Sequence, residues 1–235
     1  RDRIEAASSG ASSLDDLSDV NIHDSTASRT SMYIGTDSGS SANDGDARGN
    51  VCLGYKSGED IDYGDYDTFV GHSSGKECSS GLLNSAFGYN SYNKGTTGRH
   101  NTGLGSWALY SITTAWDNTA VGHDAMYAYN NTAHTSAGES GNVAVGVNSL
   151  RVMTGSSDAE AAQNTAVGYE TGLAVSTGSY NTLLGYKSGD TITTGANNTL
   201  VGYEADVDAA SDSGHTRLGY YGAIKYITNR ITCTK

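Results

Sequence analysis

A single phrase recurs along most of this chain, and its spacing restricts the possible fold more than any other feature. It reads Asn-Thr-Leu-Leu-Gly-Tyr at 181–186 and Asn-Thr-Leu-Val-Gly-Tyr at 198–203, so the two glycines lie 17 residues apart. Eleven glycines align in this way: Gly35, Gly54, Gly71, Gly88, Gly105, Gly122, Gly146, Gly168, Gly185, Gly202 and Gly219. Seven of the ten successive spacings equal 17 residues. Such a period indicates an array in which each unit stacks on the next.

The residues around the repeat glycine predict a short β-strand in every unit. With the glycine as position 0, position −1 is always apolar, position −4 is Asn in eight units, and position +3 is small. Alternation along a strand predicts that position −1 fills an inner layer and that the variable position +2 faces solvent. The small residues at position −2 suit a close contact between chains. Stacked Asn residues are expected to hydrogen-bond to one another or to the backbone.

A second, weaker strand is expected ten residues before the glycine. Apolar residues recur there in five units, as Ile61, Cys78, Ile112, Val175 and Ile192. Each unit is therefore expected to contain about two short strands and two turns. One such coil cannot hide its apolar side chains alone, but stacking on its neighbours can.

Composition favours a thin, elongated protein over one with a thick core. The chain has 31 Gly, no Pro and 36% apolar residues, against roughly 45–50% for a class that includes Gly in typical domains. We therefore expect an all-β solenoid of about eleven coils over residues 31–222. Residues 1–30 are interpreted as a linker or attachment segment with at most one short strand, and 223–235 as a terminal strand or cap. The longer spacings predict surface loops near 127–141 and 152–163.

Charge and hydropathy argue against two classes of partner. The net charge is −12, from 14 Lys and Arg against 26 Asp and Glu, and no basic stripe typical of nucleic-acid binding is visible. No apolar run is long enough to span a membrane. We therefore expect neither nucleic-acid binding nor membrane insertion.

Residues able to carry catalysis or bind a metal are sparse. Paired carboxylates occur in 58–67 and 43–46, but neither segment matches a calcium loop, and solvated turns explain them better. His72 and His123 replace Tyr at position +1, where copies of the chain could bring them together around a metal. A polar substitute for Tyr is the simpler interpretation. We predict no catalytic residue, no cofactor and no metal.

The three cysteines show no metal-binding spacing. Cys52 and Cys78 occupy positions that carry apolar residues in other units, so we interpret them as small core residues. Cys233, near the end of the sequence, leaves an interchain disulfide as an alternative.

Aromatic residues concentrate in the middle of the array. Exposed Trp and Tyr side chains suit contacts with sugars or proteins, because each has an apolar face and a polar edge. The possible receptor contacts are Trp107, Tyr110, Trp116, Tyr127 and Tyr129. The alternative is that these side chains pack beneath the two insertions.

The repeat unit resembles a known family. Its pattern, best seen at 118–122, 164–168, 181–189 and 198–203, is similar to the 17-residue Asn-Thr-Ala-Val-Gly-Tyr repeats of phage tail fibres and large bacterial surface proteins. These repeats look like relatives of the head repeats of trimeric autotransporter adhesins. The resemblance covers about residues 31–222. It implies a parallel homotrimer of stacked β-roll or β-helical coils, often followed by an endosialidase-type chaperone domain that assists trimerisation.

This resemblance implies a structural and adhesive function rather than an enzyme. We expect a tail-fibre segment of a virion, with other fibre or baseplate proteins and a host surface glycan or protein as partners. A bacterial surface adhesin, hence an extracellular location, is the alternative. Ice binding by the Thr columns and a polysaccharide-degrading β-helix enzyme are further alternatives from other classes.

Overall fold

The computed structural model describes residues 20–23, 30–42, 47–129, 140–155 and 160–220. Within these ranges the fold is all-β, with fourteen short strands. They are β1 (Val20–His23), β2 (Ser31–Ile34), β3 (Val51–Leu53), β4 (Thr68–Val70), β5 (Ser85–Phe87), β6 (Thr102–Leu104), β7 (Thr119–Val121), β8 (Ala128–Tyr129), β9 (Val143–Val145), β10 (Val152–Met153), β11 (Thr165–Val167), β12 (Thr182–Leu184), β13 (Thr199–Val201) and β14 (Thr216–Leu218).

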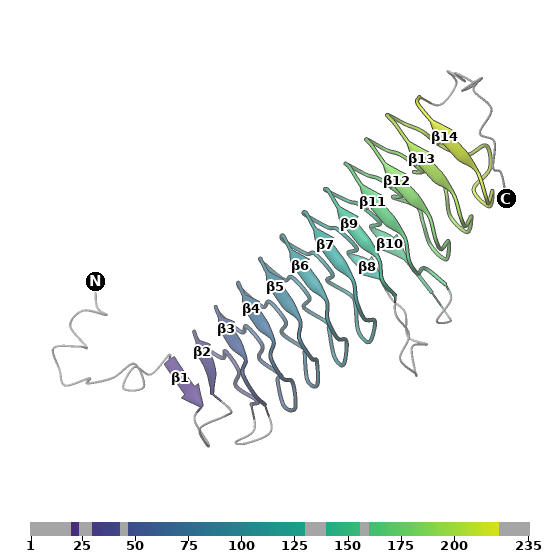
Figure 1. The fold of residues 1–235 in the computed structure, drawn as a ribbon. Coiled ribbons are helices and arrows are strands. Elements are labelled where there is room, and N and C mark those ends of the chain that lie inside the picture. The colour runs from purple at the N-terminus through teal and green to yellow at the C-terminus, as the bar shows by residue number, and fades with distance from the viewer. Residues whose placement is uncertain (1–19, 24–29, 43–46, 130–139, 156–159, 221–235) are drawn as a thin grey trace, which may run out of the picture.

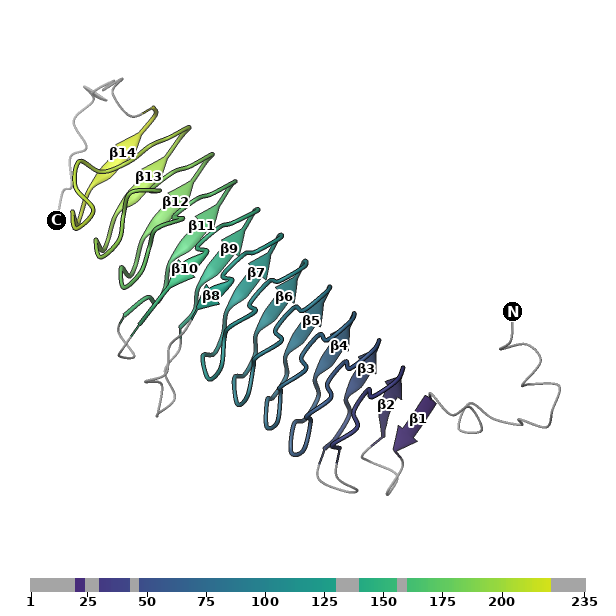
Figure 2. The same ribbon diagram turned by 180° about the vertical axis from the view of Figure 1, so that it is seen from behind.

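Twelve of these strands form one long sheet that runs along the molecule. Its order is β1-β2-β3-β4-β5-β6-β7-β9-β11-β12-β13-β14. Strands β2 to β14 pair in parallel, with each repeat position opposite the same position of the next coil. Figure 1 shows these strands as successive rungs of a rod, and Figure 2 shows the same row from behind. The chain is therefore a parallel β-solenoid of about ten turns, most of them 17 residues long, as the repeat predicts.

At one end of this sheet, β1 pairs antiparallel with β2, with Val20 opposite Ile34. This is the short strand considered possible within residues 1–30. The predicted cap at 223–235, including Cys233, and the carboxylates at 43–46 lie outside the described residues.

The side of the main sheet that faces the interior is the opposite of the one predicted. Position −2 is buried in strand after strand, as at Phe69, Ala120 and Leu183, which are all 0% exposed. Position −1 points outward instead, and Leu104 there is 49% exposed. The expectation that position −1 fills an inner layer is therefore wrong. So is the assignment of the small residues at position −2 (Ala86, Gly103, Ala120, Ala144 and Ala166) to a contact between chains.

The interior of the coil explains this reversal, because it is filled from two columns of the repeat. Phe69 is large at position −2 and Gly75 stands at position +4 of the same coil, where a Cβ would collide with the Phe69 ring. Where position −2 is Gly103, position +4 is the fully buried Leu109. The pairs Tyr33 with Gly39, Ala86 with Tyr92, Ala120 with Met126, Ala144 with Leu150 and Leu183 with Gly189 follow the same rule. Each of these coils thus has room for one large side chain from this pair of positions.

The repeat glycines form an axial row, as the stacking model requires. A Cβ on Gly122 would lie 2.5 Å from the carbonyl oxygen of Gly146, and one on Gly105 would lie 2.6 Å from that of Gly122. These three glycines also have φ between 133° and 135°, a backbone conformation that L side chains rarely adopt. Glycine is required here both by the bend and by the close approach of successive coils.

Position −4 forms a buried hydrogen-bonded ladder through the array, as predicted for stacked Asn. The Asn101 amide nitrogen donates to Asn84 Oδ1 at 3.1 Å, and the backbone N–H of Asn101 donates to the same oxygen at 3.0 Å. The same amide nitrogen also donates to the Ala115 carbonyl at 2.8 Å. This pattern satisfies both ends of a buried amide in each coil, which removes the cost of its burial.

The predicted second strand is largely absent. The five residues of this column are buried as expected, but they lie in irregular backbone directly after a turn rather than in strands: Ile61, Cys78, Ile112, Val175 and Ile192. Strand pairing at this position occurs only between β8 and β10 among the described residues. Each of these strands lies at the start of one of the two insertions, whose central parts, 130–139 and 156–159, are not described.

Candidate interaction surfaces

One uncovered surface is the outer side of the main sheet, where position −1 is apolar and position −3 is Thr or Ser in eight of the eleven repeats. We call positions −3 and −1 of the repeat the outer sheet face. None of the eleven residues at position −1 is buried. The most exposed are Leu53 (44%), Phe87 (39%), Leu104 (49%), Leu184 (46%) and Leu218 (49%). An apolar surface that extends along a whole sheet is typical of an interface.

An aromatic column borders the outer sheet face at position +1, and we call it the rim column. Tyr169, Tyr186 and Tyr203 stack with ring centroids 5.5 and 5.1 Å apart and interplanar angles of 9° and 6°. In an earlier part of the array, His72 lies between Tyr55 and Tyr89, at 4.9 and 5.3 Å. Since the stacked tyrosines occupy one another's faces, they leave mainly ring edges and hydroxyls for a ligand.

A third surface, the turn face, consists of positions +2 and +5, which follow the rim column. Ion pairs run along it: Lys56 Nζ lies 2.6 Å from Glu59 Oε1, and Lys187 Nζ lies 3.3 Å from Glu170 Oε2. The prediction that position +2 faces solvent holds only in part: Asp37 is exposed, most of the others are partly exposed, and Ser73 and Asn90 are buried. The charges on this face are arranged to attract one another between coils.

The turn face carries an aromatic cluster halfway along the array, formed by Trp107, Tyr110 and Tyr127. The centroid of the Trp107 ring lies 4.7 Å from that of Tyr110 and 5.9 Å from that of Tyr127. Tyr110 and Tyr127 stack at 5.1 Å with an interplanar angle of 7°. Lys94 Nζ lies 5.8 Å from the Tyr110 centroid, and the Arg151 guanidinium lies 5.1 Å from that of Tyr127.

The structure therefore brings together three of the five predicted receptor contacts. Trp116 lies on another part of the coil, where the Arg99 guanidinium covers its ring at 4.8 Å. Tyr129 is fully buried, and its hydroxyl donates to the Ala161 carbonyl at 3.3 Å, so it offers no surface to a receptor. The contacts of Trp107, Tyr110 and Tyr127 with one another join adjacent coils. Packing beneath the two insertions stays a prediction, because residues 130–139 and 156–159 lie outside the described ranges.

The carboxylates of 58–67 do not converge on a cleft. Glu59 is held between Lys56 and Lys76, and its pKa is lowered, first by the hydrogen bond from Lys56. Asp67 is buried in the position −4 ladder, and desolvation raises its pKa to about 7. These residues serve two structural networks rather than one reaction centre.

A separate acidic pocket of about 320 Å³ lies near the end of the array, lined by Asp190, Glu204, Asp206 and Asp208 among others. Burial, and then the hydrogen bond with Asp206, raises the pKa of Asp190 to about 6. Asp206 itself accepts the backbone N–H groups of Thr191 and Val207 at 3.2 and 2.8 Å. Sequence analysis missed this pocket, because its acidic residues come from two coils of which the second departs from the repeat.

The described residues contain no group of three His, Cys, Asp or Glu side chains arranged to hold a metal ion. His72 and His123 are exposed in the rim column of a single chain, and the metal hypothesis depends on contact between copies. Over the same described ranges there is no helix that is long and apolar enough to cross a membrane. Comparisons with models of protein families, with curated proteins and with solved structures found no match.

Proposed function

We propose that this chain is a segment of a homotrimeric fibre that spaces and presents a surface for attachment to a host cell. A tail fibre of a phage virion is the leading assignment. In this proposal the chain carries out no reaction. Its partners are two further copies of itself, neighbouring fibre or baseplate proteins, and a glycan or protein on the host surface.

The observation that carries the proposal is an in-register solenoid whose outer sheet face carries an uncovered apolar column. Every parallel pair from β2 to β14 keeps the same register. Ten steps of about 4.8 Å between neighbouring strands correspond to a rod of about 48 Å. A rod whose length grows with the number of repeats is suited to spacing, and its outer sheet face leaves a surface for further chains.

The expected attachment surface is the aromatic cluster on the turn face. Tyr110 and Tyr127 use their ring faces for each other and for the cations of Lys94 and Arg151. A host ligand would therefore meet the partly exposed Trp107 indole and the tyrosine edges. This geometry favours hydrogen-bonding groups on a glycan or protein over a sugar sandwiched between two rings.

Light scattering tests the assembly directly. One chain has a mass of 24.4 kDa, and a homotrimer has three times that mass. The mass of a single chain in solution at micromolar concentration would contradict the proposal. Binding of fluorescently labelled protein to bacterial cells tests the attachment role, and failure to bind any of a panel of hosts would remove that part.

A bacterial surface adhesin is the second candidate, since the same solenoid serves either location. Immunogold labelling with antibodies against the chain separates the two. Gold on virion tails supports the tail fibre, gold on bacterial cell walls supports the adhesin, and gold on neither contradicts both.

A further inference from the structure

We infer that the outer sheet face, together with the rim column, is the surface on which copies of this chain pack against one another. This inference rests on the fibre assembly proposed above and names the side of the solenoid that mediates it. The combined surface comprises positions −3, −1 and +1 of every one of the eleven repeats.

The first argument is that the chain does not need these side chains for its own core. The interior is filled by residues at positions −2 and +4, such as Phe69 and Leu109, and by buried residues that follow the turns, such as Ile112. Position −1 is nevertheless apolar in all eleven repeats. Since Phe87 and Leu104 remain 39% and 49% exposed, their apolar surface contributes fully only when something covers it.

The second argument concerns charge. None of these positions carries Asp, Glu, Lys or Arg in any repeat, whereas 17% of the residues in the whole chain are of these types. Two identical chains of net charge −12 repel each other, and like charges that face each other across a contact are unfavourable. A face free of formal charge is therefore what self-association requires. A partner of opposite charge would instead favour a charged face.

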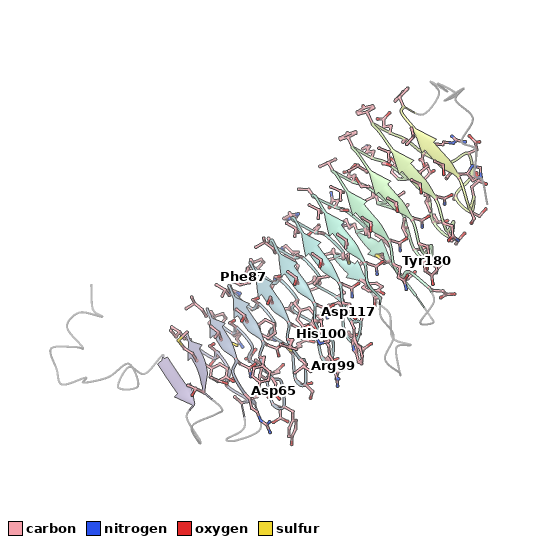
Figure 3. The ribbon with its side chains drawn as sticks, in the orientation of Figure 1. Asp65, Phe87, Arg99, His100, Asp117 and Tyr180 are labelled. Atoms are coloured by element: carbon pink, nitrogen blue, oxygen red, sulfur yellow. The ribbon has the colours of Figure 1, made fainter. Side chains whose placement is uncertain are left out.

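The other sides of the coil carry formal charges, which this face lacks. In Figure 3, Phe87 lies along one long edge of the row of strands, whereas Asp65, Arg99, His100, Asp117 and Tyr180 lie along the opposite edge. That edge exposes apolar side chains too, such as Leu83 at 50%, but it mixes them with charged ones. The turn face carries the ion pairs of Lys56 and Lys187. Charge is thus segregated away from the outer sheet face.

The third argument is geometric. A partner that packs on this face must match rows of side chains that repeat at about 4.8 Å over ten steps. A second copy of the chain has the same period because it has the same sequence. Four residue steps of about 3.3 Å across the face and about 48 Å along it give a flat area of roughly 600 Å². This flat area is of the same order as the approximately 800 Å² per partner that a standard-size interface buries.

The test places the same charge on two sides of one coil. Leu104→Glu lies on the outer sheet face, and the matched control Thr97→Glu lies on an exposed turn of the same coil. We expect the wild type and Thr97→Glu to show about three times the mass of one chain in light scattering, and Leu104→Glu to fall to the mass of a single chain. Circular dichroism establishes whether each variant retains its β-structure.

A second measurement decides the matter if Leu104→Glu does not fold. Leu104→Cys and Thr97→Cys are each made with Cys233→Ser, because Cys52 and Cys78 are already buried. Maleimide should label Leu104→Cys at least about tenfold more slowly than Thr97→Cys in the assembled protein.

The outcomes separate the inference from the proposal beneath it. A monomeric wild type contradicts the fibre assembly and the inference together. A trimeric wild type whose Leu104→Glu variant folds and remains trimeric leaves the assembly intact and overturns the inference. Equal labelling rates at the two cysteines of a trimeric protein also overturn it.

Discussion

The buried ladder at position −4 contains one carboxylic acid, and its replacement by the amide found in neighbouring coils gives a sharp test of the fold. Asp67 stands where eight other coils have Asn. Its Oδ1 accepts the backbone N–H of Asn84 at 2.7 Å and the Asn84 amide at 3.0 Å. The Cys78 thiol lies 3.8 Å from Oδ2. In the ladder's preceding rung, the Asn50 amide donates to the Gly64 carbonyl at 2.7 Å, a donation that an ionised Asp67 cannot make to its own coil.

The magnitude follows from the titration of Asp67. Burial raises its pKa from 3.8 to about 7, and the charge of Asp65 adds to this effect, while the hydrogen bonds from Asn84 and Cys78 oppose it. Because the folded state holds this proton more tightly than the unfolded state, the associated stability is complete below pH 3.8 and is lost as pH rises to about 7. A shift of about three pKa units corresponds to a loss of about 4 kcal/mol.

Asp67→Asn should remove this loss, because an amide does not ionise and can donate to both neighbouring acceptors. The unfolding free energy of the variant minus that of the wild type should increase by about 4 kcal/mol from pH 4 to pH 8. Nearly all of this increase should be reached just above pH 7. Urea unfolding followed by circular dichroism at several pH values measures it. All samples need the same chain concentration, since association contributes to apparent stability.

Asp60→Asn is the matched control, because it makes the same change of charge at a partly exposed acid outside the ladder. The difference between Asp67→Asn and wild type is the informative quantity, because other titrations, such as that of Asp190, cancel in it. If this difference is the same at pH 4 and pH 8, or if Asp60→Asn reproduces it, the conclusion that burial in the ladder keeps Asp67 protonated and raises its pKa is refuted.

Three further predictions concern the interior, the axial row and the attachment surface. Phe69→Ala should lower the unfolding free energy, measured in urea, by about 3–5 kcal/mol because it leaves a cavity. Adding Gly75→Leu to the same chain should restore part of the lost unfolding free energy. No recovery would contradict the exchange of volume between positions −2 and +4. Gly122→Ala should lower the unfolding free energy by about 3 kcal/mol, because an alanine is strained at a φ of 135° and its Cβ would collide with the Gly146 backbone. Thermal unfolding measures this loss, and an unchanged melting temperature would argue against the close stacking of coils. Trp107→Ala should weaken attachment to host cells without lowering the melting temperature, whereas a parallel loss of both would indicate a purely structural role.

The candidate surfaces were only partly predictable, and the reason is distance along the chain. Tyr110 and Tyr127 lie one period apart, so their proximity could be inferred from the repeat alone, and Trp107 lies close to Tyr110 in the sequence. Tyr129 lies only two residues beyond Tyr127, yet it points inward and packs beneath the coil. Tyr129 follows Gly122 by seven residues, just as the buried Ile112 follows Gly105, so its burial also follows from the repeat. The insertion before Gly146 hides this equivalence when positions are counted back from the next glycine.

The sequence by itself determined the period, the axial row of glycines and the amide ladder at position −4. These features follow from residue identity at fixed spacing, because only glycine tolerates the bend and a buried amide needs a partner in the next coil. They were sufficient for the solenoid, for its parallel register and for the interpretation of Cys52 and Cys78 as core residues.

Only the tertiary structure decided which side of each strand faces inward. Positions −1 and −2 are both apolar in most coils, so alternation alone leaves two solutions, and preference for burying the larger residue selected the wrong one. In several coils the interior accepts one large side chain from positions −2 and +4, as with Phe69 and Gly75. These two positions are six residues apart and meet only after the chain has turned. The larger residues at position −1 are therefore excluded from the core and left on the outer sheet face.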